Sequence, residues 1–317
     1  MSASDAKITG AKPYFAKKQK KLDKAAKTIE TRLKQLEKVE KPYEEKPLKM
    51  TLPFQEQLHN KTVIQVNRLE GKIAGQRLWE KASFFIKGGD KVAIIGPNGS
   101  GKTTLLNHIL DRVDGVSVSS ACRFGYFKQD LSILDEDKTI LENVKKDSYY
   151  DETFIRIVLA RLKFKKDDVF KKIRLLSGGE RVKVALAKLF VSGHNILVLD
   201  EPTNFLDLEA VEALENLLME YEGTLLFVSH DRRFVEKIAA KIIVIENQQL
   251  QFFDGTYKEY MMQAERQREK DERKEKLLLL ETKMSDVLSR LSLEPSDELE
   301  KQFEQLLQEK QKLLDEG

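Results

Sequence analysis

The stretch Gly96-Pro97-Asn98-Gly99-Ser100-Gly101-Lys102-Thr103 decides the fold of this chain. A short apolar segment, Lys91–Ile95, precedes it and is typical of a buried strand, and a helical pattern, Leu105–Leu110, follows it. The stretch matches the pattern G-x-x-x-x-G-K-[ST], and a position between a strand and a helix is the context that supports a phosphate-binding loop. Its glycines let backbone N–H groups surround phosphate oxygens, and the helix adds the positive end of its dipole. The sequence therefore predicts a nucleotide site at this loop.

Individual side chains of the loop have distinct predicted roles. Lys102 should reach the β- and γ-phosphates of the nucleotide, and the Thr103 hydroxyl should be a ligand of Mg²⁺. Thr104, the next residue along the helix, is expected to contact the nucleotide as well. Loops of this kind occur in many ATPases and GTPases, so the pattern alone predicts nucleotide binding and no particular reaction.

A second apolar segment, Ile196–Leu199, ends in two acidic residues, Asp200 and Glu201. At the end of a strand, Asp200 is placed to hold Mg²⁺ through water. Glu201 is the candidate general base that polarises the attacking water. Acidic pairs at strand ends are often plain loop residues, but the Pro202-Thr203-Asn204 run that follows and the other motifs favour the catalytic interpretation.

Further apolar segments predict the rest of the core. Thr224–Val228 and Lys241–Glu246 resemble buried strands. Buried strands that alternate with helical stretches are typical of a mostly parallel α/β sheet. Val63–Val66 and Ala82–Ile86 look like the strands of an antiparallel start. Residues 139–187 are helical in pattern and are predicted to form an inserted helical subdomain.

Composition limits the class of protein. The chain has 317 residues, and 34 % of them are charged, well above the usual share of about a quarter, which indicates long solvated helices. The single cysteine, Cys122, cannot form an internal disulfide and fits a reducing compartment. No apolar run approaches the roughly 18 residues of a membrane span, and the N-terminus lacks the apolar region of a signal peptide. These features predict a soluble, cytoplasmic protein without a membrane span.

Both ends of the chain are helical in pattern and highly charged. In Lys17–Glu40 an apolar stripe has the spacing of a coiled-coil seam and consists of Leu22, Ala26, Ile29, Leu33 and Leu36. Residues 1–41 hold 12 Lys and Arg against 5 Asp and Glu, which indicates a nucleic-acid partner or, alternatively, only a solvated lysine-rich helix. Glu265–Gly317 contains two more stripes separated by a break at Leu293–Ser296, and it predicts a two-helix hairpin.

The string Leu176-Ser177-Gly178-Gly179-Glu180 narrows the choice among nucleotide-binding proteins. It resembles the signature of ATP-binding cassette proteins. A serine hydroxyl, two glycine N–H groups and a helix N-terminus form a second phosphate cradle. The resemblance implies that this cradle serves the nucleotide held by an opposite cassette, so that two cassettes form one sandwich. It also implies an α/β P-loop cassette fold, with a RecA-like core, an antiparallel β subdomain and the inserted helical subdomain.

The same resemblance assigns roles to single residues. Gln129, after Tyr126-Phe127-Lys128, resembles the Q-loop glutamine that senses Mg²⁺ and water. His230 resembles the switch histidine that contacts the γ-phosphate, although a lone histidine is more often structural. Asp207 resembles the D-loop aspartate that communicates across the cassette dimer. Phe205 stands where the family usually has histidine.

The adenine platform departs from the family pattern. Cassettes usually place an aromatic residue on a loop ahead of the phosphate loop, and counting from the strand Ala82–Ile86 puts Ile73 at that position. Isoleucine packs on adenine without the specific geometry of ring–ring contacts, which predicts relaxed base selectivity. Trp79 is the alternative stacking residue, although it falls where a buried apolar residue is expected.

Several stretches point to one branch of the cassette family. Glu201-Pro202-Thr203-Asn204-Phe205-Leu206-Asp207 and Gly255-Thr256-Tyr257 resemble the ABC-F group. Leu36–Pro42 resembles the end of the linker that joins two ABC-F cassettes. The resemblance implies a ribosome partner, with the basic linker reaching the 50S rRNA and the P-site tRNA region. The run from Leu280 to Pro295 further resembles the Vga-like antibiotic-resistance branch, which implies protection of the ribosome against large-subunit antibiotics.

The chain differs from the ABC-F pattern because it carries a single cassette. We expect the C-terminal half of a longer protein or a truncated reading frame, in which ATP hydrolysis requires the absent half or a second copy. The predicted domains are a basic loop, linker helix and connector at 1–60, the cassette at 61–260, and the hairpin at 261–317. The alternatives are a housekeeping ABC-F translation factor and, from another class, the ATPase subunit of a membrane transporter.

Overall fold

A computed structural model describes residue 27 and residues 58–128, 131–294 and 296–315. The chain divides into a unit at Met1–Leu48, of which only the exposed, helical Lys27 is described, and a unit at Lys49–Gly317. The predicted basic linker and most of its connector therefore lie outside the described residues.

The centre of this unit is a six-stranded sheet in the order β5-β6-β7-β3-β8-β9. All neighbouring strands pair in parallel except β8 and β9, which are antiparallel. The prediction of a mostly parallel α/β sheet is confirmed. The strands are β3 Lys91–Ile95, β5 Phe124–Phe127, β6 Ile196–Asp200, β7 Thr224–Val228, β8 Lys241–Glu246 and β9 Gln249–Phe253. The sequence did not predict β5, which has only four residues, or β9, which has no buried residue.

A second, antiparallel sheet has the order β2-β1-β4, with β1 Thr62–Ile73, β2 Gln76–Lys87 and β4 Val116–Val118. The first two strands are much longer than predicted. They continue to a two-residue turn in which Ala74 (φ 46°) and Gly75 (φ 85°) are both left-handed, the geometry whose twist matches that of a β-hairpin. The hairpin therefore extends Ile73 beyond the core.

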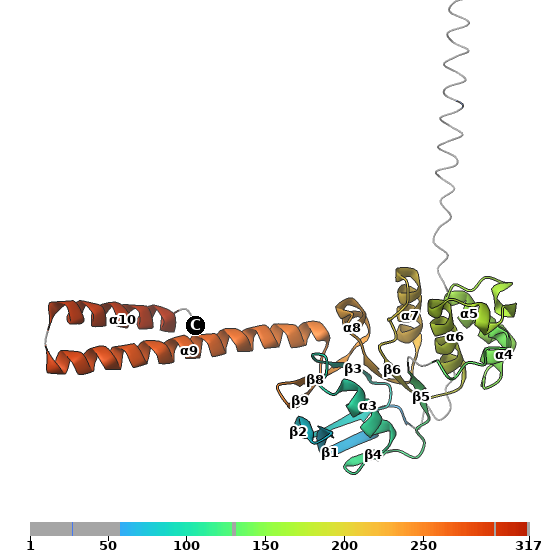
Figure 1. Ribbon diagram of the computed structural model, residues 1–317, viewed down its shortest axis with the longest axis horizontal. Coiled ribbons are helices and arrows are strands. Elements are labelled where there is room, and N and C mark those ends of the chain that lie inside the picture. The colour runs from blue at the N-terminus through green and yellow to red at the C-terminus, as the bar shows by residue number, and fades with distance from the viewer. Residues whose placement is uncertain (1–26, 28–57, 129–130, 295, 316–317) are drawn as a thin grey trace, which may run out of the picture. The chain divides into compact units, whose positions relative to one another are not determined.

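Helices cover both faces of the six-stranded sheet, as in doubly wound folds. Figure 1 shows α7 (Leu208–Glu220) and α8 (Arg232–Ile238) on one face and α3 (Lys102–Leu110) on the other. The buried side of α3 joins the two sheets in one apolar core through Leu105, Leu106 and Ile109. This packing fixes the start of α3, and with it the phosphate loop, against the ends of β3 and β6.

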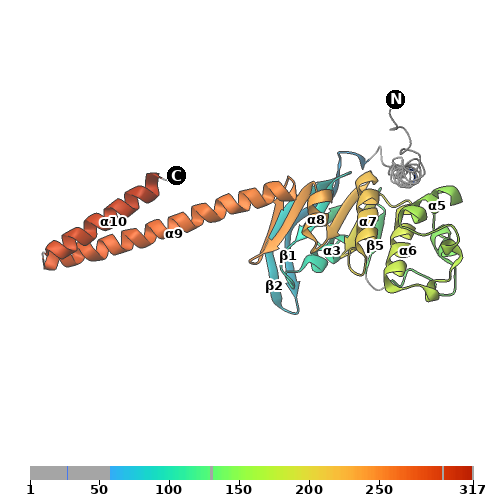
Figure 2. The same cartoon turned by 90° about the horizontal axis from the view of Figure 1, so that it is seen from above.

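The inserted segment is helical, as predicted, with α4 Ile140–Lys145, α5 Glu152–Arg161 and α6 Gly178–Val191. Two short 3-10 turns, Asp168–Phe170 and Ile173–Leu175, precede α6. Figure 2 shows these helices gathered beside the sheet. Helix α6 continues four residues beyond the predicted limit at residue 187, because the apolar run up to Val191 remains buried.

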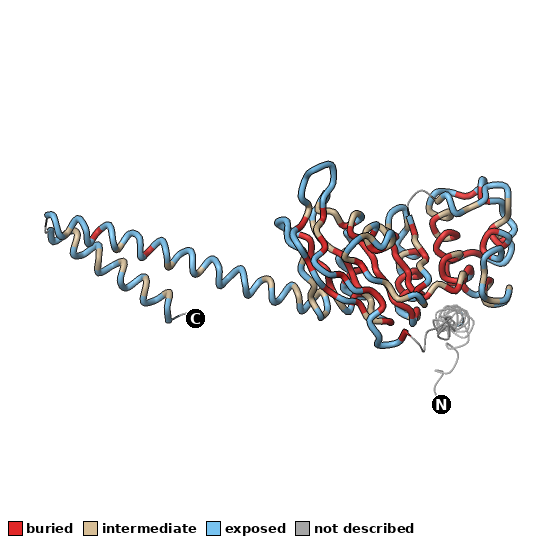
Figure 3. The backbone as a smooth tube through the Cα atoms, turned by 90° about the horizontal axis from the view of Figure 1, so that it is seen from below, coloured by how far each residue is buried: buried red, intermediate tan, exposed pale blue. Residues whose placement is uncertain are grey.

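The C-terminal region is a hairpin of α9 (Tyr257–Leu293) and α10 (Asp297–Asp315). The predicted start of this region, at residue 261 or 265, was too late. Thr256 and Glu259 form a capping box that begins α9 at Tyr257, and such a box satisfies two N-terminal donors at once. Figure 3 shows that the hairpin is mostly exposed. Leu280 and Val287 are buried along its seam, and Lys310 pairs with Glu281 at 2.8 Å.

Candidate functional site

The phosphate loop leaves β3 and turns directly into α3. Gly96 is tightly enclosed, because a Cβ there would lie 2.3 Å from the Ile245 carbonyl oxygen. Gly99, at φ 78°, has open space where a side chain would be. Gly101 precedes the first turn of α3 and provides no side-chain cap. The first N–H groups of α3 thus face the loop without a capping side chain, which is the arrangement that helix N-termini present to anions.

Lys102 and Thr103 project from the first turn of α3 into the loop. The Lys102 ammonium donates to the carbonyl oxygens of Gly96 and Pro97, each at 3.0 Å. Burial lowers the pKa of Lys102, and the nearby carboxylates of Glu201 and Asp200 oppose that effect. The Thr103 hydroxyl donates to Asp200 Oδ2 at 2.9 Å. The structure therefore joins the loop to the acidic end of β6.

Glu201 occupies a constrained position directly after β6. Its backbone is left-handed, with φ 52°, and its N–H donates to the Val228 carbonyl oxygen at 3.0 Å. The His230 N–H donates to Glu201 Oε2 at 3.3 Å. Glu201 Oε1 lies 3.2 Å from His230 Nε2, yet it is buried without a well-aligned hydrogen bond. Left-handed backbone at a non-glycine residue is strained and is concentrated at functional sites.

A cavity of about 470 Å³ connects these groups. Its volume lies within the range of about 300 to 1,000 Å³ that is usual for small-molecule sites. Two of its aliphatic members, Leu78 and Val228, were not among the site residues predicted from the sequence. The residues that line it are Ile73, Leu78, Asn98, Gly99, Gly101, Lys102, Thr103, Thr104, Asp200, Glu201, Val228 and His230.

The two candidates for the adenine platform differ in exposure. Ile73 is 55 % exposed and lines the cavity. Trp79 is fully buried, and a Cβ on Gly71 would lie 2.3 Å from its ring. The alternative in which Trp79 stacks on a base is therefore wrong, because its ring fills the space between the hairpin and α3.

The signature string lies apart from this cavity. Ser177 caps α6, and its hydroxyl and N–H form a capping box with Glu180. The hydrogen bond from the Ser177 hydroxyl, with that from the backbone, lowers the pKa of Glu180. Neither these residues nor Asp207, whose Oδ1 accepts from the Ala210 N–H at 2.8 Å, lines the cavity. Gln129 lies outside the described residues.

One contact of the signature was not predicted. A Cβ on Gly179 would lie 2.6 Å from the Phe205 carbonyl oxygen, whereas a Cβ on Gly178 would meet nothing within 4 Å. Phe205 has a left-handed backbone, with φ 68°, and its side chain is 75 % exposed. The loop after Glu201 therefore lies against the start of α6 within the same chain.

Substituting alanine at these two glycines should have different effects on stability. Gly179→Ala forces the Phe205 backbone to move and should destabilise the fold by about 1–3 kcal/mol, lowering Tm by several degrees. Gly178→Ala has space for its methyl group and should leave Tm unchanged or slightly higher, because alanine favours helix. Thermal unfolding followed by circular dichroism tests both. Equal Tm values for the two variants would show that the Phe205 contact is not tight.

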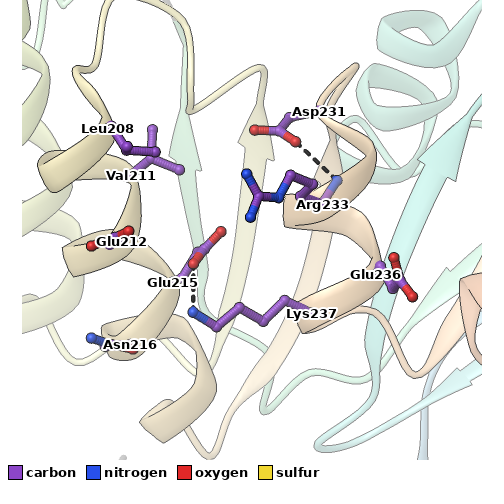
Figure 4. Close-up of a pocket in the computed structure, with 9 residues that line it drawn as sticks. All are labelled: Leu208, Val211, Glu212, Glu215, Asn216, Asp231, Arg233, Glu236 and Lys237. Carbon is purple, nitrogen blue, oxygen red and sulfur yellow. Dashed lines mark hydrogen bonds and ion pairs between the residues drawn. The ribbon is translucent and has the colours of Figure 1, made fainter.

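A larger cavity, of about 540 Å³, lies between α7 and α8 and contains none of the predicted site residues. Figure 4 shows its charged side chains. Glu215 and Lys237 pair across it at 2.6 Å, and Asp231 accepts the Arg233 N–H at 2.9 Å as the cap of α8. These contacts account for much of its polar lining, so the smaller cavity at the phosphate loop is the candidate site.

Comparison with known proteins gives the class of the chain. Residues 79–204 match the family model described as ABC transporter. Three observations define an ATP-binding cassette, which is a domain class of ATPases. They are this match, the mostly parallel sheet, and the hydrogen bond that joins the phosphate loop to the acidic end of β6. In the described part of the chain, no helix has the length and apolar character needed to cross a membrane.

Several curated proteins are similar to this chain. The chain is 36 % identical over 315 residues to the ribosome protection protein VmlR of Bacillus subtilis. The matched region covers 97 % of this chain and 56 % of that protein. It is 37 % identical to ABC transporter F family member 5 of Arabidopsis thaliana, over 74 % of this chain and 35 % of that protein. It is also 37 % identical to the erythromycin resistance ATP-binding protein MsrA of Staphylococcus epidermidis, over 70 % of this chain and 46 % of that protein. The chain carries an ATP-binding cassette and is similar to ABC-F proteins over most of its length, and it spans between a third and just over half of the length of these relatives.

Proposed function

We propose that this chain is the ATP-binding and ATP-hydrolysing cassette of an ABC-F protein that binds the ribosome and protects it from large-subunit antibiotics. The observation that carries the proposal is the extent of the match to VmlR, named as a ribosome protection protein. That match covers 97 % of the chain and so includes the basic N-terminal segment and the C-terminal hairpin. MsrA, named for erythromycin resistance, matches 70 % of the chain.

The residues at the cavity fit Mg-ATP. Lys102 and the N–H groups at the start of α3 would bind the β- and γ-phosphates. Thr103 and Asp200 would hold Mg²⁺, with Gln129, which lies outside the described residues, as a further proposed ligand. Ser100 Oγ and Glu201 Oε1 are buried without aligned partners, and a phosphate oxygen and a water molecule would satisfy them. Among the residues that the structure describes, no three His, Cys, Asp or Glu side chains group into a metal site. Mg²⁺ is commonly bound by one or two carboxylates plus substrate phosphates.

Hydrolysis depends on Glu201 and His230. Glu201 accepts a proton from the water that attacks the γ-phosphorus, and the bond to the β-γ bridging oxygen breaks to give ADP and phosphate. The His230 N–H and the Val228 carbonyl hold Glu201 in position. The exposed His230 ring, which lines the cavity, contacts the γ-phosphate.

A second cassette completes the proposed site. Ser177, Gly178, Gly179 and Glu180 lie away from the chain's own phosphate loop, so they serve a nucleotide on a facing cassette, and Asp207 contacts that cassette. ATP binding closes the two cassettes. Closure fixes the basic linker on the ribosome near the 50S rRNA and the P-site tRNA, where lysines and arginines neutralise phosphates, and hydrolysis releases it.

Co-sedimentation tests ribosome binding. The full-length Glu201→Gln protein should pellet with 50S or 70S particles in ATP, because it closes on ATP without hydrolysing it. Lys102→Ala, which removes the phosphate-binding ammonium, is the control and should remain in the supernatant. If Glu201→Gln pellets no better in ATP than without it, the proposed ribosome function is wrong.

A second candidate is an ABC-F translation factor without a role in resistance. It is favoured by relatives whose names state only ATP binding, such as the putative ATP-binding protein YdiF of Bacillus subtilis, 38 % identical over 74 % of this chain. Expression in a susceptible strain separates the candidates. If the protein confers resistance, its expression should reduce susceptibility to lincosamides, pleuromutilins and streptogramin A. If it is only a translation factor, susceptibility should not change.

A further inference from the structure

A further cavity, of about 200 Å³, adjoins the proposed ATP site. Its lining residues come from the end of β3, the end of β7, helix α8 and the start of α9, and we call it the α8–α9 cavity. His230 lines both this cavity and the ATP site, and Gly96 of the phosphate loop lines the α8–α9 cavity as well. The α8–α9 cavity therefore borders the place that we propose for the γ-phosphate.

The topology of the sheet brings these segments together. Strands β3 and β7 are parallel neighbours, with Ile94 opposite Val228. Gly96 and His230 follow these strands and leave the sheet at the same edge, the carboxyl edge at which α/β proteins bind their ligands. Helix α9 begins beside α8 (Figure 1) and brings Tyr257 to this edge. The elements that hold the ATP site thus also form the α8–α9 cavity.

The polar side chains that line the α8–α9 cavity can all donate hydrogen bonds. They are Ser229, His230, Arg232 and Tyr257, and no carboxylate is among the described residues that line it. Arg232 is exposed and forms no ion pair with a carboxylate in the part of the chain that the structure describes. Because a guanidinium binds phosphate through charge-assisted hydrogen bonds, this lining suits an anion.

Two carboxylates adjoin the lining residues, and both have partners elsewhere. Asp231 accepts the Arg233 N–H at 2.9 Å as the cap of α8. Glu201 Oε1 lies 3.2 Å from His230 Nε2 in the ATP site. Neither carboxylate lines the α8–α9 cavity. The positive charge of Arg232 therefore has no carboxylate partner there.

The size of the cavity favours a small anion. Its volume, about 200 Å³, is below the range of about 300 to 1,000 Å³ that is usual for drug-sized ligands. Hydrolysis of ATP, the proposed function on which this inference rests, produces inorganic phosphate beside His230. We propose that the α8–α9 cavity binds this phosphate through Arg232 and Tyr257 after it leaves the ATP site. ADP stays at the phosphate loop, so the two products occupy separate places.

Titration of inorganic phosphate into the whole chain, saturated with Mg²⁺ and ADP, tests the site. Binding is followed by the broadening of the phosphorus NMR signal of phosphate. Arg232→Gln removes the positive charge and should weaken phosphate binding about five- to twentyfold. Tyr257→Phe removes one hydroxyl and should weaken it about two- to fivefold. Arg232 is exposed and forms no ion pair with the described residues, so its variant should keep the wild-type Tm.

Arg233→Gln is the matched control. Arg233 is also exposed and loses the same charge, but it lines the cavity between α7 and α8 instead. Its variant should bind phosphate as the wild type does. Equal losses of affinity in Arg232→Gln and Arg233→Gln would overturn the inference, because phosphate would then respond only to the charge of the surface.

Lys102→Ala distinguishes the α8–α9 cavity from the phosphate loop. Without nucleotide, this variant should bind phosphate as tightly as the wild type does with ADP, because the proposed site does not use Lys102. Phosphate binding that Lys102→Ala abolishes and Arg232→Gln leaves unchanged would place phosphate at the loop and overturn the inference.

ATP binding by the wild-type chain separates this inference from the proposed function. A chain that does not bind ATP refutes the proposed function and the inference with it. A chain that binds ATP, but whose affinity for phosphate does not depend on Arg232, refutes the phosphate site alone.

Discussion

Replacing Glu201 with glutamine should abolish ATP hydrolysis and leave ATP binding intact. The amide keeps the size of the carboxylate, and its oxygen still accepts the His230 N–H, but it cannot take a proton from water. The backbone position of Glu201 does not depend on its charge, because its N–H is bonded to the Val228 carbonyl oxygen. Loss of a general base typically costs about 10²- to 10⁴-fold in rate. Phosphate release at saturating ATP and equilibrium ATP binding measure the two effects.

Glu209→Gln is the matched control for this experiment. Glu209 is exposed in the first turn of α7 and does not line the cavity. Its replacement by glutamine removes one negative charge, as Glu201→Gln does. Its turnover and its affinity should equal those of the wild type. Turnover above about a tenth of the wild-type rate in Glu201→Gln would mean that another group accepts the proton.

The sheet was predictable where strands are buried on both faces. Lys91–Ile95, Thr224–Val228 and Lys241–Glu246 have the predicted bounds, because near-continuous apolar runs mark the centre of a parallel sheet. The β1–β2 hairpin was longer than its apolar core because half of its strand residues are exposed, and most of these are polar or charged. Its end at Ile73 depends on the turn at Ala74 and Gly75, and alanine is an unusual residue for left-handed backbone.

The site was predictable where short motifs fix the chemistry. The pattern of the phosphate loop and the acidic end of β6 identified groups that the structure brings together, such as Thr103 and Asp200 at 2.9 Å. Contacts between segments distant in the chain were not predictable. The closeness of Gly179 to the Phe205 carbonyl depends on how the α6 start and the loop after β6 approach each other, and no local pattern records such a distance.

Introducing a carboxylate at Gly178 should block ATP hydrolysis. Gly178 belongs to the signature string, which forms the half of the proposed composite site that faces the phosphate loop of the other cassette. Gly178→Asp has open space for its side chain, and an acidic residue in the first turn of a helix is favourable, so the fold should keep its Tm. The carboxylate then occupies the proposed cradle and repels the phosphates of the facing cassette. ATP binding to the chain's own loop should not change, whereas turnover should fall to background.

Mixing two inactive variants tests whether the facing cassette is a second copy of this chain. In a dimer of Gly178→Asp with Glu201→Gln, one site combines the intact Glu201 of the first chain with the intact Gly178 of the second. An equal mixture of freely exchanging chains should regain about a quarter of the wild-type turnover, because half of the dimers are mixed and each has one competent site. No recovery would exclude a second copy as the facing cassette. Wild-type turnover by Gly178→Asp alone would instead show that Ser177–Gly179 are not part of the site. A carboxylate would then occupy the cradle without affecting hydrolysis.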